Sequence, residues 1–226
     1  MSLLVVEPVI RAALVVEDAR AHASGEQHEE VFSRPVQVVG GLLTAVLVGL
    51  ALGVVFAVVF ARARHRLPGG GDFGRALVLA AAGFGVLALL PSVKYPASPP
   101  GVGDPETVGA RTLLYLTLLA AGILVLLAVT VIAAALARRG WRHPERVSAA
   151  AAAGALLFVA VLALWPATPD TVPPDIPAEL LWRFRLASLA QLAALWATLG
   201  LVTGLLLERA GRAQQGSSTP AAATSG

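Results

Sequence analysis

The sequence predicts an all-α, polytopic transmembrane helix bundle, and three observations lead to this fold class. Of the 226 residues, 57% are hydrophobic and only 14% are charged, whereas about 25% of the residues of a soluble domain are charged. The hydrophobic residues form long blocks instead of the periodic stripes of a soluble helix. The arginines gather between these blocks, as they do at the edges of a membrane.

Five apolar segments are long enough to cross a bilayer, which takes about 20 residues in a helix. They cover residues 36–61, 75–91, 112–137, 147–165 and 186–207. We therefore expect a membrane bundle over residues 36–209. Residues 1–35 form an acidic, histidine-containing segment outside the membrane. Residues 210–226 form a disordered tail, because their Gly, Ser, Gln, Thr and Ala bury nothing.

The charge distribution predicts the orientation of the bundle. Segments 62–75 and 138–147, with the residues after the last span, carry ten basic residues and three acids, whereas the alternate segments carry seven basic residues and eleven acids. By the positive-inside rule, the Arg-rich segments face the cytoplasm. The N-terminal segment and the connectors 91–112 and 166–185 then face outward, and the C-terminus is cytoplasmic.

The N-terminal segment contains the first candidate metal ligands, which are His22, Glu26, His28, Glu29 and Glu30. In a helix, residues 22, 26, 29 and 30 share one face. Imidazole together with carboxylate suits Co²⁺, Ni²⁺, Zn²⁺ or Mn²⁺. A solvated acidic surface helix explains the same residues, so both interpretations stay open.

Residues 91–112 form a connector with five prolines between the second and third spans. Asp104 and Glu106 offer carboxylates to a cation, whereas Lys94 opposes a cation site beside it unless an acid pairs with it. The connector is therefore either a mouth that guides a cation inward or a rigid lid over the helix ends. Its signature residues are Lys94, Tyr95, Pro96, Pro99, Pro100, Asp104 and Pro105.

Few polar residues lie within the apolar segments. Gln37, Ser188 and Gln191 on the first and last spans either line a path or make ordinary interhelical hydrogen bonds. The middles of the spans contain no ionisable residues, which usually mark proton relays. This argues against a self-sufficient proton-coupled pump. At the start of the last span, Glu179 and Arg183 stand at the spacing of a helical ion pair.

Small residues indicate close helix packing on the first and last spans. They recur every four positions at residues 45, 49, 53 and 57, and again at Gly200 and Gly204. This spacing lets helices approach one another closely. It fits a packed bundle and equally a homo-oligomer.

Several classes of function are excluded by what the sequence lacks. It has no cysteine, and its one methionine is Met1, so thiolate and thioether metal sites are excluded. It contains no nucleophile elbow, P-loop or nucleotide fingerprint, so we expect neither an enzyme nor a tightly bound cofactor. The net charge of +3 lies at membrane edges, which indicates a bilayer and not a nucleic acid as the partner.

Three segments together resemble one family, the probable cobalt transporter subunits called CbtA. They are residues 22–34 leading into Gln37, residues 90–107 followed by Arg111, Thr112 and Tyr115, and residues 181–200. The Lys-Tyr-Pro, Pro-Pro and Gly-Asp-Pro sequence of the second segment is the most specific of these. The resemblance extends from about Val5 to Glu208.

The resemblance implies a subunit of a cobalt uptake transporter that serves cobalamin biosynthesis in a bacterial cytoplasmic (inner) membrane. It also implies Co²⁺ as the transported ion and a small, single-span, histidine-containing partner called CbtB. Members of the family usually begin with an additional hydrophobic span. We therefore expect a sixth, N-terminal span to be missing before residue 1. The alternative is a membrane scaffold that binds a partner subunit and transports nothing itself.

Overall fold

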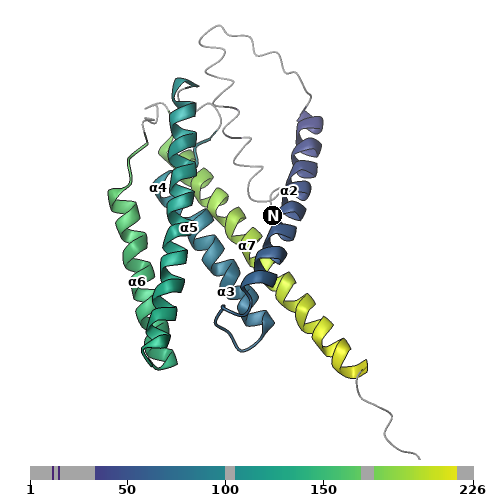
Figure 1. Cartoon of the computed structure of the whole chain (residues 1–226). Helices are drawn as coiled ribbons and strands as arrows, with labels where there is room; N and C mark the ends of the chain where they lie inside the picture. The colour runs from purple at the N-terminus through teal and green to yellow at the C-terminus, as the bar shows by residue number, and fades with distance from the viewer. Residues whose placement is uncertain (1–11, 13–14, 16–33, 100–104, 169–175, 218–226) are drawn as a thin grey trace, which may run out of the picture. The chain divides into compact units, whose positions relative to one another are not determined.

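The computed structural model describes residues 12, 15, 34–99, 105–168 and 176–217, and these ranges are almost entirely helical (Figure 1). Helix α2 covers Arg34–Ala63 and α3 covers Asp72–Phe84, which continues through a π-helical turn, Gly85–Leu89, into α4, Leu90–Lys94. A 3₁₀ turn, Pro105–Thr107, leads into α5, Val108–Arg138. Helices α6, His143–Leu164, and α7, Ala178–Ser217, follow.

Five of these helical stretches are long and apolar enough to span a membrane: Val39–Ala63, Asp72–Lys94, Val108–Arg138, His143–Leu164 and Ala178–Gln214. The described ranges contain no strand. The predicted fold class, an all-α bundle with five spans in this chain, is therefore confirmed.

The helices are longer than the apolar segments that predicted them. The second helical stretch continues past residue 91 to Lys94, and α5 begins at Val108, so the irregular part of the 91–112 connector is shorter than expected. Helix α7 begins at Ala178 and continues to Ser217, so residues 210–217 are helical and the predicted tail is wrong for them. Hydropathy marks only the part of a helix that lies in lipid. Glu, Arg, Gln and Ala form helices well beyond that part.

The helices divide into two compact units. One contains Met1–Glu29 and Gly83–Ala193, and the other contains Glu30–Ala82 and Ala194–Gly226. In the first unit, α5 and α6 pack side by side as a hairpin (Figure 1). Helix α5 ends in a Schellman motif, in which Gly140 N donates to Ala137 O at 3.1 Å and Trp141 N donates to Leu136 O at 3.2 Å. Gly140 has a φ of +77°, a conformation that glycine adopts without strain.

The π-helical turn of the first unit is explained by Pro91. A proline ring in an α-helix clashes with the carbonyl four residues earlier, and its nitrogen cannot donate. Here Leu90 N donates five residues back to Gly85 O, which widens the helix just before the proline. Gly122 of α5 packs against this turn, where a Cβ would lie 2.9 Å from Val86 O.

The second unit is held together by glycines of α7 that lie against α3. A Cβ at Gly200 would lie 2.7 Å from Ala80 Cβ, and a Cβ at Gly204 would lie 2.6 Å from Phe73 Cδ2. The predicted packing role of these two glycines is confirmed. Of the small residues on α2, Gly53 has Leu199 at 4.0 Å, whereas a Cβ at Gly49 would meet nothing within 4 Å. Phe56 and Trp196 add an edge-to-face ring contact with centroids 6.4 Å apart.

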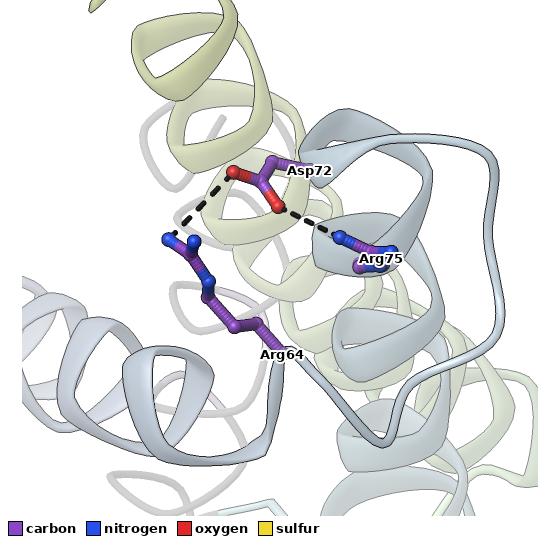
Figure 2. Close-up of polar contacts among 3 residues, drawn as sticks. All are labelled: Arg64, Asp72 and Arg75. Carbon is purple, nitrogen blue, oxygen red and sulfur yellow. Dashed lines mark hydrogen bonds and ion pairs between the residues drawn. The ribbon is translucent and has the colours of Figure 1, made fainter. Parts of the chain in front are cut away.

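An aspartate between two arginines closes the connection from α2 to α3 (Figure 2). Asp72 Oδ1 accepts from Arg75 Nη1 at 3.2 Å, and Asp72 Oδ2 lies 3.9 Å from Arg64 Nη1. The preceding turn requires glycine at residue 69, where φ is +146° and a Cβ would lie 3.0 Å from Arg75 N. The carboxylate also lies in the first turn of α3, where negative charge stabilises a helix.

We predict that Gly122→Ala destabilises the protein, because the added methyl group would lie against the backbone carbonyl of Val86. Overpacking of this kind costs about 1–3 kcal/mol. Gly109→Ala in the same helix is the matched control, since a Cβ there would meet nothing within 4 Å. The midpoint of thermal unfolding in detergent should fall for the first variant and stay or rise for the second. Equal midpoints would contradict the close approach of α5 to the π-helical turn.

Candidate functional site

Lys94, the first residue of the predicted signature, is bound to a backbone carbonyl and not to an acid. Its Nζ donates to Leu162 O in the last turn of α6 at 2.9 Å, and the side chain is partly buried. The carbonyls at a helix C-terminus carry partial negative charge, so an ammonium group there is stabilising. Lys94 thus joins the end of the second span to the end of the fourth.

The carbonyl of Leu162 is open to Lys94 because of Pro166. In a continuing helix, Leu162 O would accept from the N–H four residues later, and proline has none. The residue before a proline also avoids the helical conformation, and Trp165 accordingly adopts φ −71° and ψ 143°. Trp165 N donates to Val161 O at 2.9 Å, so α6 ends at Leu164 with Trp165 as its C-cap, directly before the proline.

Tyr95, the second signature residue, makes a parallel contact. Its hydroxyl donates to Pro166 O at 2.8 Å. Partial burial raises the pKa of the Tyr95 hydroxyl above its ordinary value, because desolvation disfavours the phenolate. Lys94 and Tyr95 together form what we call the Lys-Tyr clamp, which fastens the start of the connector to the end of α6.

The remaining signature residues fall partly outside the described residues. Pro96 is partly buried and Pro99 is buried, so the connector leaves the clamp against the protein. Pro100 and Asp104 lie outside the description, and Pro105 begins the 3₁₀ turn. The contacts of Lys94 and Tyr95 agree with a rigid lid, because Lys94 binds a carbonyl that the end of α6 leaves open and Tyr95 binds a carbonyl just beyond that end.

The candidate metal ligands remain a prediction. His22, Glu26, His28, Glu29 and Glu30 lie outside the described residues, as does Asp104, and the described carboxylate Glu106 is exposed in the 3₁₀ turn. Within the ranges that are described, no three His, Asp or Glu residues come together as a metal site would require.

The predicted pathway residues lie on two helices. Ser188 and Gln191 are partly buried on α7, and their spacing of three residues puts them on one helix face. Gln37 lies in the first turn of α2, and its side chain is outside the description. Ser188 and Gln191 belong to the first unit and Gln37 to the second.

The beginning of α7 matches its predicted polar and aromatic pattern. Glu179 Oε1 and Arg183 Nε lie 3.5 Å apart, which confirms the expected ion pair. Both side chains are largely exposed, so the pair contributes little to stability. Trp182 is 61% exposed, as an aromatic residue at the membrane interface would be.

Sequence reasoning missed the two acceptors of the clamp, Leu162 O and Pro166 O. Backbone carbonyls leave no residue-type signal of their own. The available signal was the proline directly after the fourth span, since a proline in that position leaves a carbonyl one turn earlier without its helical partner. A lysine and a tyrosine at the end of another span are suitable donors for such carbonyls.

Five membrane-length helices joined by short connectors define a polytopic helical membrane protein. Within that class, the chain belongs to the CbtA family: the family model described as "Probable cobalt transporter subunit (CbtA)" matches residues 1–208. The family resemblance suggested by the sequence is thereby confirmed. Neither the curated proteins nor the solved structures include a significant match to the chain.

We predict that Lys94→Met destabilises the protein by about 1.5–3 kcal/mol, the usual contribution of a hydrogen bond with a charged partner. Pro166→Ala should reduce this cost, because it supplies an N–H four residues after Leu162. A double-mutant cycle on thermal unfolding measures the coupling, which we expect to be about 0.5–3 kcal/mol. Pro177→Ala is the control background, since it makes the same replacement away from Leu162. If Lys94→Met costs the same in all three backgrounds, the proline does not explain the clamp.

Proposed function

We propose that this protein is an integral membrane subunit of a divalent-cation uptake transporter, with Co²⁺ as the transported ion. The match of the CbtA family model to residues 1–208 carries the proposal. Five helices of membrane length support it, since a transported ion needs a protein that crosses the bilayer. Membership in a family of transporter subunits argues against an enzymatic activity, so we propose none.

The cation is captured on the face formed by the N-terminal segment and the connector after Lys94. In this proposal, His22, His28 and the acids Glu26, Glu29 and Glu30 raise the local cation concentration. Asp104 and Glu106 act at the entrance. Lys94 is compatible with a cation nearby because its charge is held against the C-terminal carbonyls of α6.

The path through the membrane uses Gln37, Ser188 and Gln191. Two observations support the part on α7: Ser188 and Gln191 share a helix face, and both are partly buried. Amide and hydroxyl oxygens are weak ligands compared with carboxylates, so an ion can pass without being trapped.

The word subunit in the family description implies a partner. We propose a small single-span partner containing histidine, of the CbtB type, and a bacterial inner membrane with the C-terminus in the cytoplasm. The Arg-rich connectors and the positive-inside rule support this orientation. Cobalamin biosynthesis is the proposed use of the imported cobalt.

A second candidate function is a membrane scaffold that assembles a transporter without conducting the ion. One observation favours it: within the described ranges, no cluster of metal ligands is present. Glycine-mediated packing of the α7–α3 kind also suits assembly with another transmembrane helix or a second copy.

We predict that cells lacking this protein take up less radiolabelled cobalt, and that His22→Ala/His28→Ala and Asp104→Asn raise the apparent KM. The rise should be roughly tenfold or more, the loss typical of disturbing a metal site. Glu179→Gln is the matched control, since it removes an exposed carboxylate that is paired with Arg183. Unchanged cobalt uptake after deletion of the whole protein would contradict the transport proposal.

Cobalt uptake into proteoliposomes distinguishes a permease from a scaffold. A permease admits cobalt to an internal metal-sensitive dye when it is reconstituted with its partner, and the His22, His28 and Asp104 variants change the KM. A scaffold leaves the KM unchanged in every variant and affects only the amount of partner that is assembled.

A further inference from the structure

Four arginines gather at the turn between α5 and α6 without carboxylate partners. They are Arg138, the last residue of α5, Arg139, Arg142 and Arg146 in the first turn of α6. Arg138, Arg139 and Arg142 are exposed and Arg146 is partly exposed. Within the described ranges, none of the four forms an ion pair.

The one acid of this turn is already engaged. Glu145 Oε2 accepts from the backbone N–H of Arg142 at 3.3 Å, as the N3 acid of a capping box does. With four arginines and one glutamate, the turn carries an excess of positive charge, and no ion pair within the described ranges compensates it.

Four other arginines of the described ranges form ion pairs with acids. Arg64 and Arg75 share Asp72, and Arg212 pairs with Glu208 at 3.0 Å. At the far end of the first unit, Arg183 lies beside Glu179. Arg62 and Arg66 also lack an ion pair within the described ranges, but no tryptophan lies near them in the sequence. The α5–α6 turn is distinguished by its combination of unpaired arginines with the exposed Trp141.

The length of α5 agrees with a turn at the level of the lipid headgroups. Its 31 residues extend over about 46 Å at 1.5 Å per residue, whereas a bilayer with its headgroups is about 40–45 Å thick. Trp141, in the middle of the turn, is 45% exposed, and tryptophan prefers the membrane–water interface. The Schellman motif at Gly140 fixes the reversal of the chain.

We propose that the α5–α6 turn binds the phosphate of an anionic phospholipid headgroup. Guanidinium groups bind phosphate oxygens through two parallel hydrogen bonds. Arg139 and Arg142 flank Trp141, whose ring inserts beside the acyl chains while the arginines hold the phosphate. A lipid fits better than a soluble anion because the turn combines positive charge with an exposed indole at headgroup depth.

The test compares two matched double variants in nanodiscs of phosphatidylcholine, with and without phosphatidylglycerol. Arg139→Gln/Arg142→Gln removes two arginines from the turn. Arg62→Gln/Arg66→Gln removes two exposed arginines, one in the last turn of α2 and one just after it. The readouts are the unfolding temperature and the number of phosphatidylglycerol molecules retained in native mass spectrometry.

We expect phosphatidylglycerol to raise the unfolding temperature of the wild type and of the Arg62/Arg66 variant. The Arg139/Arg142 variant should lose most of this rise and retain phosphatidylglycerol roughly fivefold less per arginine removed. Its unfolding temperature in phosphatidylcholine alone should equal that of the wild type. If it does not, the variant Arg139→Lys/Arg142→Lys tests the proposal instead. Lysine keeps the charge but cannot form two parallel hydrogen bonds, so this variant should keep part of the rise in unfolding temperature caused by phosphatidylglycerol.

Three results would overturn the proposal. Equal losses in both double variants would reduce the effect to general charge attraction. If inorganic phosphate raised the unfolding temperature equally in phosphatidylcholine nanodiscs, the turn would bind a soluble anion and not specifically a lipid. A lysine variant as impaired as the glutamine variant would indicate a structural defect of the turn.

Discussion

Two missing N–H groups, those of Pro91 and Pro166, determine how one end of the first unit is built. In a bilayer no water is available to satisfy a carbonyl that a proline leaves without a partner. At Pro91 the helix widens into a π turn, and glycine at residue 122 lets α5 approach the altered backbone. At Pro166 the helix stops, and Lys94 reaches across to the open carbonyl of Leu162.

These two solutions are linked through one short helix. Pro91 lies in the first turn of α4, and Lys94 ends this helix three residues later. The π turn therefore sets where Lys94 emerges, and Lys94 in turn fastens α6. The Lys-Tyr pair thus donates to backbone carbonyls at the end of α6. The sequence left open whether the signature motif is the mouth of a cation path or a rigid lid, and its first two residues make structural contacts.

The fold was largely predictable because hydrophobicity and charge carry strong signals in membrane proteins. Five apolar segments predicted the five spans, and Gly200 and Gly204 predicted a close helix contact whose partner, α3, the sequence did not identify. The ends of α7 were missed because Ala178–Arg185 are mostly good helix formers and residues 210–217 continue the helix despite two glycines, and hydropathy registers neither stretch. The clamp was missed because its acceptors, Leu162 O and Pro166 O, are backbone atoms. The candidate metal ligands depend on His22–Glu30 and Asp104, which lie outside the described residues, so they stand on the sequence alone.

Helix α6 shows why the two ends of the first unit require different counter-charges. Its C-terminus carries the negative end of the helix dipole, and the chain supplies a cation there in the form of Lys94. Its N-terminus carries the positive end of the dipole, where negative charge would be stabilising, yet three arginines precede it and a fourth lies within its first turn. Glu145 supplies one negative charge and is bound to the backbone of Arg142. The balance is restored most simply from the membrane itself, because anionic headgroups are the negative charges that surround a helix end at this depth.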